Sequence, residues 1–261
     1  MRNSRRLLLR LLSAALAVGP LAERAEAQAT AADEGWRFQL TPYFWAAGVA
    51  GTVGIRRLPS LEVDASFSDI IDKFDIGFLG RFEGRKSRWG FATDIVYLNL
   101  GAPLAGEQPI ILILEPPVDV RQVLGEGTFF YRLASDASDR ERAYVDAFVG
   151  GRYVKLRTQI GLVGGSVREN SVDWLDAILG LRGRAPLGGK AALFARGDIG
   201  GFGSKFAWNV EAGLAFQLSS SISLGAGYRY LHDDYEQGEG ADRVSADIGF
   251  GGPGIFAAFS F

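Results

Sequence analysis

Two long alternating segments in the last quarter of the chain constrain its fold more than any other feature. Apolar side chains occupy every second position from Phe206 to Leu218, and polar or small residues occupy the positions between them. The same alternation returns from Ile222 to Tyr230, after a turn of three serines. Successive side chains of a β-strand point to opposite faces of its sheet, so each segment predicts a strand with one apolar face. Each segment is as long as the roughly 9–11 residues that cross a membrane as a tilted strand. We therefore expect an all-β fold, a transmembrane antiparallel β-barrel whose apolar residues face lipid.

The N-terminus has the three parts of a secretory signal peptide. Three arginines lie within the first six residues, a largely apolar stretch follows from Leu7 to Leu21, and Ala25-Glu26-Ala27 matches the A-x-A cleavage pattern. An uncleaved basic amphipathic helix is the alternative interpretation of this segment. The predicted organisation is a signal peptide at 1–27, a short N-terminal tail at 28–34 and the barrel at 35–261.

The composition excludes several classes of site. The chain has no cysteine, which excludes disulfides, thiolate catalysis and cysteine-based metal sites. Cleavage after residue 27 removes five arginines and two glutamates, so the formal charge moves from -2 by -3 to -5. Such an acidic exported protein is not expected to bind nucleic acid. No run of about 18 apolar residues follows the leader, which argues against a helical membrane span.

The remaining alternating segments predict about ten antiparallel strands, within a range of eight to twelve. An even number places both ends of the barrel on one side, as in bacterial outer-membrane barrels. Twelve strands would result if Gly51–Ile55 and Glu62–Phe67 formed an additional hairpin. Loops are predicted at 101–117, near 164–171 and at Glu236–Asp242. The apolar parity of the last strand switches at Gly251-Gly252-Pro253, which predicts a β-bulge there.

One segment breaks the β pattern and predicts a short helix at 66–74. Its apolar residues recur at the i, i+3, i+4 and i+7 spacing of a helical stripe, and they are Phe67, Ile70, Ile71 and Phe74. The helix could cap the mouth of the barrel, fold into the lumen as a plug, or form a helical turn within an external loop.

Charged residues of both signs fall on the predicted inward face. An arginine or lysine facing lipid would cost about 2–4 kcal/mol at the membrane midplane, so these charges are expected to line the lumen. They could border a water-filled channel, or they could pair across a narrow lumen and fill it. The near balance of signs and the prevalence of arginine favour pairing, since a guanidinium binds a carboxylate at two positions. The residues are Arg81, Glu83, Asp94, Glu126, Arg132, Asp146, Arg152, Asp176, Arg182, Arg184, Arg196, Asp198, Glu211 and Arg229.

Other motifs give weaker signals for chemistry. The glycine-rich stretch at 197–203 is followed by a strand, whereas a phosphate-binding loop needs a helix there. His232 is the only histidine and stands beside Asp233 and Asp234, but no serine at a suggestive position completes a hydrolase site. The acidic residues of 233–242 could bind a divalent cation, with a solvated acidic loop as the alternative. We therefore predict no catalytic, cofactor-binding or metal-binding residue and no cofactor.

The chain resembles the outer-membrane β-barrel superfamily of Gram-negative bacteria, and more narrowly a proteobacterial group of porin-like barrels. The leader, the alternating hairpins and the C-terminal Phe261 carry the broader resemblance. The narrower one rests on Val63–Ile71, Leu193–Gly203 and Gly227–Leu231. The resemblance implies an outer-membrane location, contact with lipid and lipopolysaccharide, and Phe261 as the signal read by the barrel-assembly machinery.

Three hypotheses for function follow. The first is porin-like passage of small polar solutes through a narrow charged lumen, without enzymatic activity. The second is a closed structural barrel that serves envelope integrity or surface interaction. The third is a lipid-modifying outer-membrane enzyme that would use His232.

Overall fold

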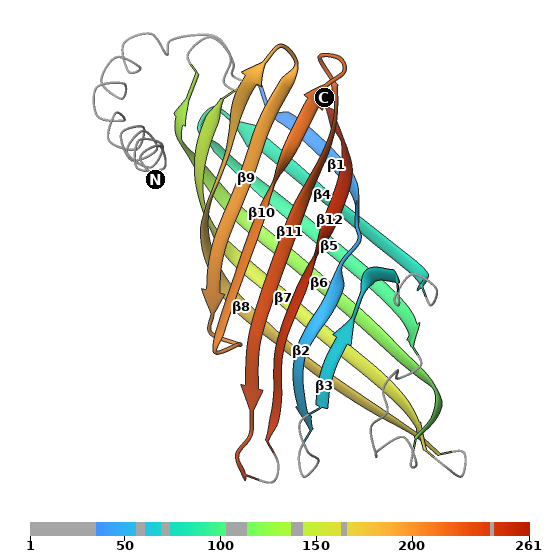
Figure 1. Cartoon of the computed structure of the whole chain (residues 1–261). Coiled ribbons are helices and arrows are strands. Elements are labelled where there is room, and N and C mark those ends of the chain that lie inside the picture. Colours follow the sequence, from blue (N-terminus) through green and yellow to red (C-terminus); the bar gives the residue numbers. More distant parts are fainter. Residues whose placement is uncertain are drawn as a thin grey trace, which may run out of the picture.

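The alternating segments form a closed antiparallel barrel in the computed structural model of the chain (Figure 1). The structure describes residues 35–55, 61–68, 74–102, 114–136, 143–162, 166–240 and 243–261. The predicted signal peptide and tail, residues 1–34, therefore lie outside the described residues. No helix among the described residues is long and apolar enough to span a membrane.

Twelve strands are present in the described chain, each antiparallel to its neighbours. They are β1 (Arg37–Trp45), β2 (Gly48–Ile55), β3 (Leu61–Ala65), β4 (Phe74–Lys86), β5 (Trp89–Ala102), β6 (Leu114–Ser135), β7 (Tyr144–Leu162), β8 (Ser166–Gly188), β9 (Ala191–Gly201), β10 (Phe206–Gln217), β11 (Ile222–Gln237) and β12 (Val244–Ser260).

These twelve strands make a barrel wall of ten, as the sequence predicts. β12 pairs with both β1 and β2 in one continuous register, so β2 extends β1 within the wall. Among the described residues β3 pairs with β2 alone. The additional hairpin predicted from 51–67 therefore exists as β2–β3, but it does not raise the barrel to twelve strands.

The outer face of the barrel is apolar, as a lipid-facing surface requires. Phe129 and Phe78 are 71% and 59% exposed, and the exposed side chains of β10 include Val210, Leu214 and Phe216. The β10 residues of the opposite parity face the interior, and Ala207, Asn209 and Ala215 among them are buried. Exposed apolar residues arranged as a continuous band around a closed wall are the pattern of a transmembrane barrel.

The two ends of the barrel differ. At the terminus end, where the C-terminus lies beside the start of β1, short turns join β4 to β5, β8 to β9 and β10 to β11 (Figure 1). At the opposite, loop end, β6, β7 and β8 reach 22, 19 and 23 residues. A membrane crossing takes roughly 9–11 residues, so these strands continue well beyond it.

The long strands correct three predicted loops. Of the loop predicted at 101–117, residues 101–102 end β5 and residues 114–117 begin β6. The loop predicted near 164–171 is strand from Ser166 onward, because Ser166 pairs with Leu162 of β7. In the third loop, Glu236 and Gln237 still belong to β11. Strands beyond the membrane face water, so their polar residues resemble loop sequence without forming loops.

The bulge predicted at 251–253 is also absent. β12 pairs with β11 in unbroken register from Val244 to Phe259. Its even-numbered residues face inward throughout, so Ala246 and Ile248 are buried in the interior, whereas Ile255 faces outward. The apolar parity switches because the interior itself is apolar at the loop end, while the backbone remains regular.

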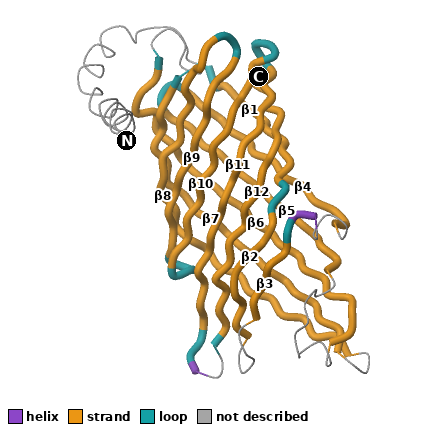
Figure 2. The backbone as a smooth tube through the Cα atoms, viewed as in Figure 1, coloured by secondary structure: helices purple, strands orange, loops and turns teal. Residues whose placement is uncertain are grey.

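Most of the helix predicted at 66–74 lies outside the described residues. Within this segment Phe67 and Ser68 are helical (Figure 2), Ser66 is not, and Phe74 already belongs to β4. Ile70 and Ile71 lie outside the described residues. The ring of Phe67 packs edge-on against Phe44, with centroids 5.6 Å apart, and Phe44 is an outward-facing residue of β1. The segment therefore begins on the outer surface of the barrel, which argues against a plug in the lumen.

Candidate functional site: a filled lumen

A network of buried ion pairs crosses the middle of the lumen. At its centre Arg152 of β7 is fully buried and binds two carboxylates. Its Nε donates to Glu126 Oε1 at 2.8 Å and its Nη2 donates to Asp198 Oδ1 at 2.6 Å. Arg196 of β9 binds the same two acids, at 2.6 Å to Glu126 and 3.0 Å to Asp198. Two guanidinium groups thus share two carboxylates in the arrangement that arginine geometry favours.

Further arginines connect this centre to the opposite wall. Arg229 of β11 lies 3.5 Å from both Asp94 of β5 and Glu126 of β6, and its Nε donates to Asn209 at 3.0 Å. Arg81 of β4 pairs with Asp94 at 3.0 Å and with Glu211 of β10 at 3.1 Å. The contacts therefore run between strands on opposite sides of the barrel. We call these residues, with Tyr43, the central network.

A second, smaller cluster lies on the terminus side. Asp146 accepts from Arg132 Nε at 2.8 Å and from Arg182 Nε at 3.2 Å, and Arg182 also reaches Glu83 at 2.8 Å. The Arg182 guanidinium lies over the ring of Phe130, 4.0 Å from its centroid. Cation–π contact and ion pairing together hold this arginine in the interior.

The structure brings almost all of the inward charges predicted from sequence into contact with one another. Asp176 and Arg184 are the two that form no ion pair with the others. Asp176 is fully buried and accepts hydrogen bonds from the backbone N–H groups of Gly203 and Ser204 and from the Ser204 hydroxyl. It therefore holds the β9–β10 turn against β8. Arg184 lies nearer the terminus end.

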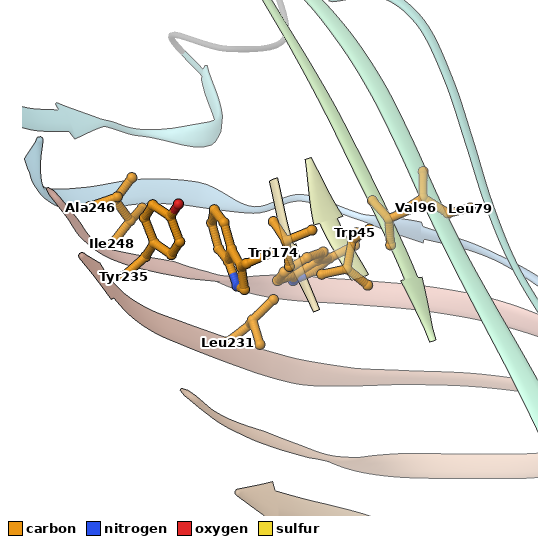
Figure 3. Packing of buried hydrophobic residues seen from close by; sticks show 10 residues of the cluster. Trp45, Leu79, Val96, Trp174, Leu231, Tyr235, Ala246 and Ile248 are labelled. Carbon is orange, nitrogen blue, oxygen red and sulfur yellow. The ribbon is translucent and has the colours of Figure 1, made fainter. Parts of the chain in front are cut away.

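An apolar layer closes the lumen next to the central network, toward the loop end. Figure 3 shows the packing of its side chains. On several strands a residue of this layer lies two positions nearer the loop end than a residue of the central network. Val154 has this relation to Arg152 on β7, and Leu231 has it to Arg229 on β11. The rings of Trp174 and Tyr235 stack across the interior with centroids 4.5 Å apart. We call this layer the apolar cap, and its buried members are Trp45, Leu79, Val96, Leu124, Val154, Trp174, Leu231, Tyr235, Ala246 and Ile248.

The cap forms because the barrel wall divides at the loop end. The β1–β4 ladder ends where Pro42 faces Gly80, and proline has no N–H with which to continue it. Beyond this point β2 pairs with β12 and β3, while β4 remains with β5. One sheet then carries Trp174 and Val154, and the other carries Leu231 and Ile248. Their inner faces pack against each other as in a β-sandwich.

Network and cap together fill the lumen. Arg152, Leu124 and Leu231 are at most 1% exposed, so neither water nor lipid reaches this level of the interior. The alternation of the sequence predicts the charges on the inward face but not the cap. Asp233 was also missed as a lumen residue, although it has the same parity as Arg229 and that parity would have revealed it.

Asp233 is buried, and neither carboxylate oxygen has a hydrogen-bond partner among the described residues. A buried carboxylate without a partner is costly, and a neutral amide of the same shape costs less. We expect Asp233→Asn to raise the free energy of unfolding by about 1–3 kcal/mol, measured by urea titration of the barrel in lipid vesicles. Asp247→Asn, at a residue that is largely exposed, is the control and should change it by less than about 0.5 kcal/mol. A less stable Asp233→Asn variant would mean that the carboxylate has a stabilising role.

A cavity with an accessible volume of about 120 Å³ remains on the terminus side of the central network, and it is open at that end of the barrel. We call it the vestibule. Arg81, Arg196, Glu211 and Arg229 line it where it meets the network. The cavity therefore ends at the network and does not continue through the barrel.

One carboxylate of the acidic segment at the loop end, that of Glu236, is paired with two cations. Glu236 accepts hydrogen bonds from Lys205 and Arg243, and the hydrogen bond from Lys205 is the main cause that lowers the pKa of Glu236. His232 lies 3.3 Å from Asp247, and its ring neighbours Trp208. No serine hydroxyl is hydrogen-bonded to His232 in the described part of the chain.

Comparison with solved structures shows which known fold this barrel has. The outer membrane protease OmpT from Escherichia coli matches with a TM-score of 0.54 at 6% identity, over 89% of this chain and 99% of that one. The fold is that of the Gram-negative outer-membrane β-barrels. The translocator domain of autotransporter NalP from Neisseria meningitidis matches at 14% identity with a TM-score of 0.41, over 95% and 96% of the two chains. Neisserial surface protein A matches at 14% identity with a TM-score of 0.35, over 87% and 100%. No protein-family model and no curated protein matches the chain.

Proposed function

We propose that the protein is a closed barrel of the outer membrane, with a structural or surface role and no enzymatic activity. The observation that carries this proposal is the central network backed by the apolar cap. Passage of a polar solute would require breaking buried ion pairs, and removing one partner of such a pair typically costs about 3–5 kcal/mol. The loop-end sandwich, supported by the long strands β6, β7 and β8, is the part that the barrel would present at the cell surface.

Porin-like passage is the second candidate, and the vestibule favours it. Half of a solute path already exists there, open to water and lined by charges. Conduction would then depend on another conformation, in which cap and network separate. The solute selectivity of that state would be set by the arginines that line the vestibule.

A liposome-swelling assay separates the two candidates. We expect vesicles that contain the protein to swell in isotonic arabinose no faster than protein-free vesicles, because the lumen is filled. Vesicles with an open general porin serve as the positive control. Swelling at a rate proportional to the amount of inserted protein would favour the porin-like candidate.

The C-terminal Phe261 supports assembly through the barrel-assembly machinery, with lipid and lipopolysaccharide as the final surroundings. Its backbone N–H and C=O exchange hydrogen bonds with Phe38 at 2.9 Å, and the two rings lie 6.1 Å apart, so this residue helps close the barrel. We expect Phe261→Ala to reduce strongly the amount of heat-modifiable protein in the outer-membrane fraction. Ser260→Ala is the control and should leave it unchanged. Normal amounts of the Phe261→Ala variant would contradict the role of this residue in assembly.

A further inference from the structure

The vestibule has the form of a binding pocket rather than a passage. It opens at the terminus end, near Gln39 and Ala215, and it ends at the central network. Small-molecule sites are typically concave cavities of a few hundred to about a thousand Å³, with apolar walls and a few polar groups that orient the ligand. The vestibule is smaller, with an accessible volume of about 120 Å³, so it admits only a small ligand, and both kinds of wall are present.

One cation in the vestibule, Arg184, forms no ion pair with any residue that the structure describes. The other lumen arginines of the central network and of the terminus-side cluster each pair with one or more carboxylates. Arg184 of β8 has no ion pair among the described residues, and its Nε is buried without a hydrogen-bond partner. It lines the vestibule between Tyr144 and Phe194, which face it on the neighbouring strands. A buried guanidinium donor without an acceptor is a position where an anion would be stabilised.

The wall beside Arg184 is aromatic, and glycines make room for it. Phe194 of β9 and Phe256 of β12 meet edge-on with centroids 5.4 Å apart. A Cβ atom on Gly225 would lie 2.1 Å from the Phe256 ring, and one on Gly213 would lie 2.7 Å from the Phe194 ring. Glycine weakens a strand interior, so the strands lose some stability at these two positions. In return, the absence of a side chain leaves space for the two rings. The two rings give the vestibule an apolar surface.

We propose that the vestibule binds a small organic anion, with a carboxylate held by Arg184 and a flat apolar body packed on Phe194 and Phe256. A guanidinium fork binds a carboxylate through two hydrogen bonds, and aromatic faces favour a flat partner. In the membrane orientation with periplasmic termini, the ligand would enter from the periplasm. The binding site does not depend on whether the barrel conducts.

Isothermal titration calorimetry of the detergent-purified protein tests this, with benzoate, benzamide and inorganic phosphate as the probes. We expect benzoate to bind saturably at one site, and benzamide, which has the same ring without the charge, to bind at least about tenfold more weakly. Arg184→Gln should weaken benzoate binding by about tenfold or more. Phe194→Leu should weaken benzoate binding while leaving phosphate binding unchanged.

Arg88→Gln, in the β4–β5 turn outside the vestibule, is the matched control and should bind benzoate as the wild type does. The heat-modifiable gel shift of each variant reports that the barrel is intact. Absence of benzoate binding, equal binding of benzamide, or full binding by intact Arg184→Gln would overturn the proposal. Phosphate binding as tight as that of benzoate would overturn the part assigned to the aromatic wall.

Discussion

Replacing Arg152 by alanine should lower the free energy of unfolding by about 3–5 kcal/mol, which is the typical cost of removing one partner from a buried ion pair. Asp198 would lose its shortest contact with an arginine, and Glu126 would lose its second-shortest. Both carboxylates lie in an interior that water does not reach. Arg196 would still neutralise part of their charge, but it cannot occupy the position of the missing guanidinium. Urea titration of the barrel in lipid vesicles, monitored by tryptophan fluorescence, measures the change.

Lys205→Ala is the matched control for charge removal. Lys205 pairs with Glu236 at the loop end, and its side chain is 52% exposed. Exposed pairs contribute about 0–1 kcal/mol, so this variant should lie close to the wild type. Equal losses for Arg152→Ala and Lys205→Ala would mean that the lumen is hydrated and that the central network does not act as a buried structure.

Trp174→Ala should cost a similar amount, about 3–5 kcal/mol, through the apolar cap. Trp174 is 5% exposed, stacks on Tyr235 and belongs to the same apolar cap as Val154 and Leu231. Its removal leaves a cavity between the two sheets that their backbones, hydrogen-bonded into the barrel wall, have little freedom to close. The same urea titration measures the loss.

Phe202→Ala is the control for aromatic truncation, because Phe202 is 97% exposed at the β9–β10 turn. It should change the stability by less than about 0.5 kcal/mol. The cap would not be a packed core if Trp174→Ala were as mild as this control.

The architecture could be predicted from sequence because lipid requires an apolar side chain at every second residue of a membrane-spanning strand. The row from Phe206 to Leu218 shows this directly, and the strand count followed from the number of such rows. The errors lie where that constraint ends. Beyond the membrane both faces of a strand tolerate polar residues, so the start of β8 at Ser166 resembled a loop.

The charged lumen was partly predictable, and the apolar cap was not. Charges such as Arg152 and Asp198 stand out because lipid excludes them from the other face. Trp174 and Leu124 share that inward face, but an apolar residue there carries no comparable signal, since only the divided wall above Pro42 brings the two sheets together. The switch of apolar parity at 251–253 is a sign of this apolar interior. It had been interpreted as a change in backbone geometry, a β-bulge. The aromatic wall of the vestibule likewise depends on Phe194 and Phe256 meeting across the two strands between them, β10 and β11.

Single-channel conductance in a planar bilayer tests most directly whether the lumen is closed. With insertion of the wild-type protein confirmed by protease protection and by the heat-dependent gel shift, we expect a bilayer without stable current steps. Stepwise currents of uniform size from the wild-type protein would contradict the closed lumen, because ions would then be crossing the level of Arg152 and Trp174.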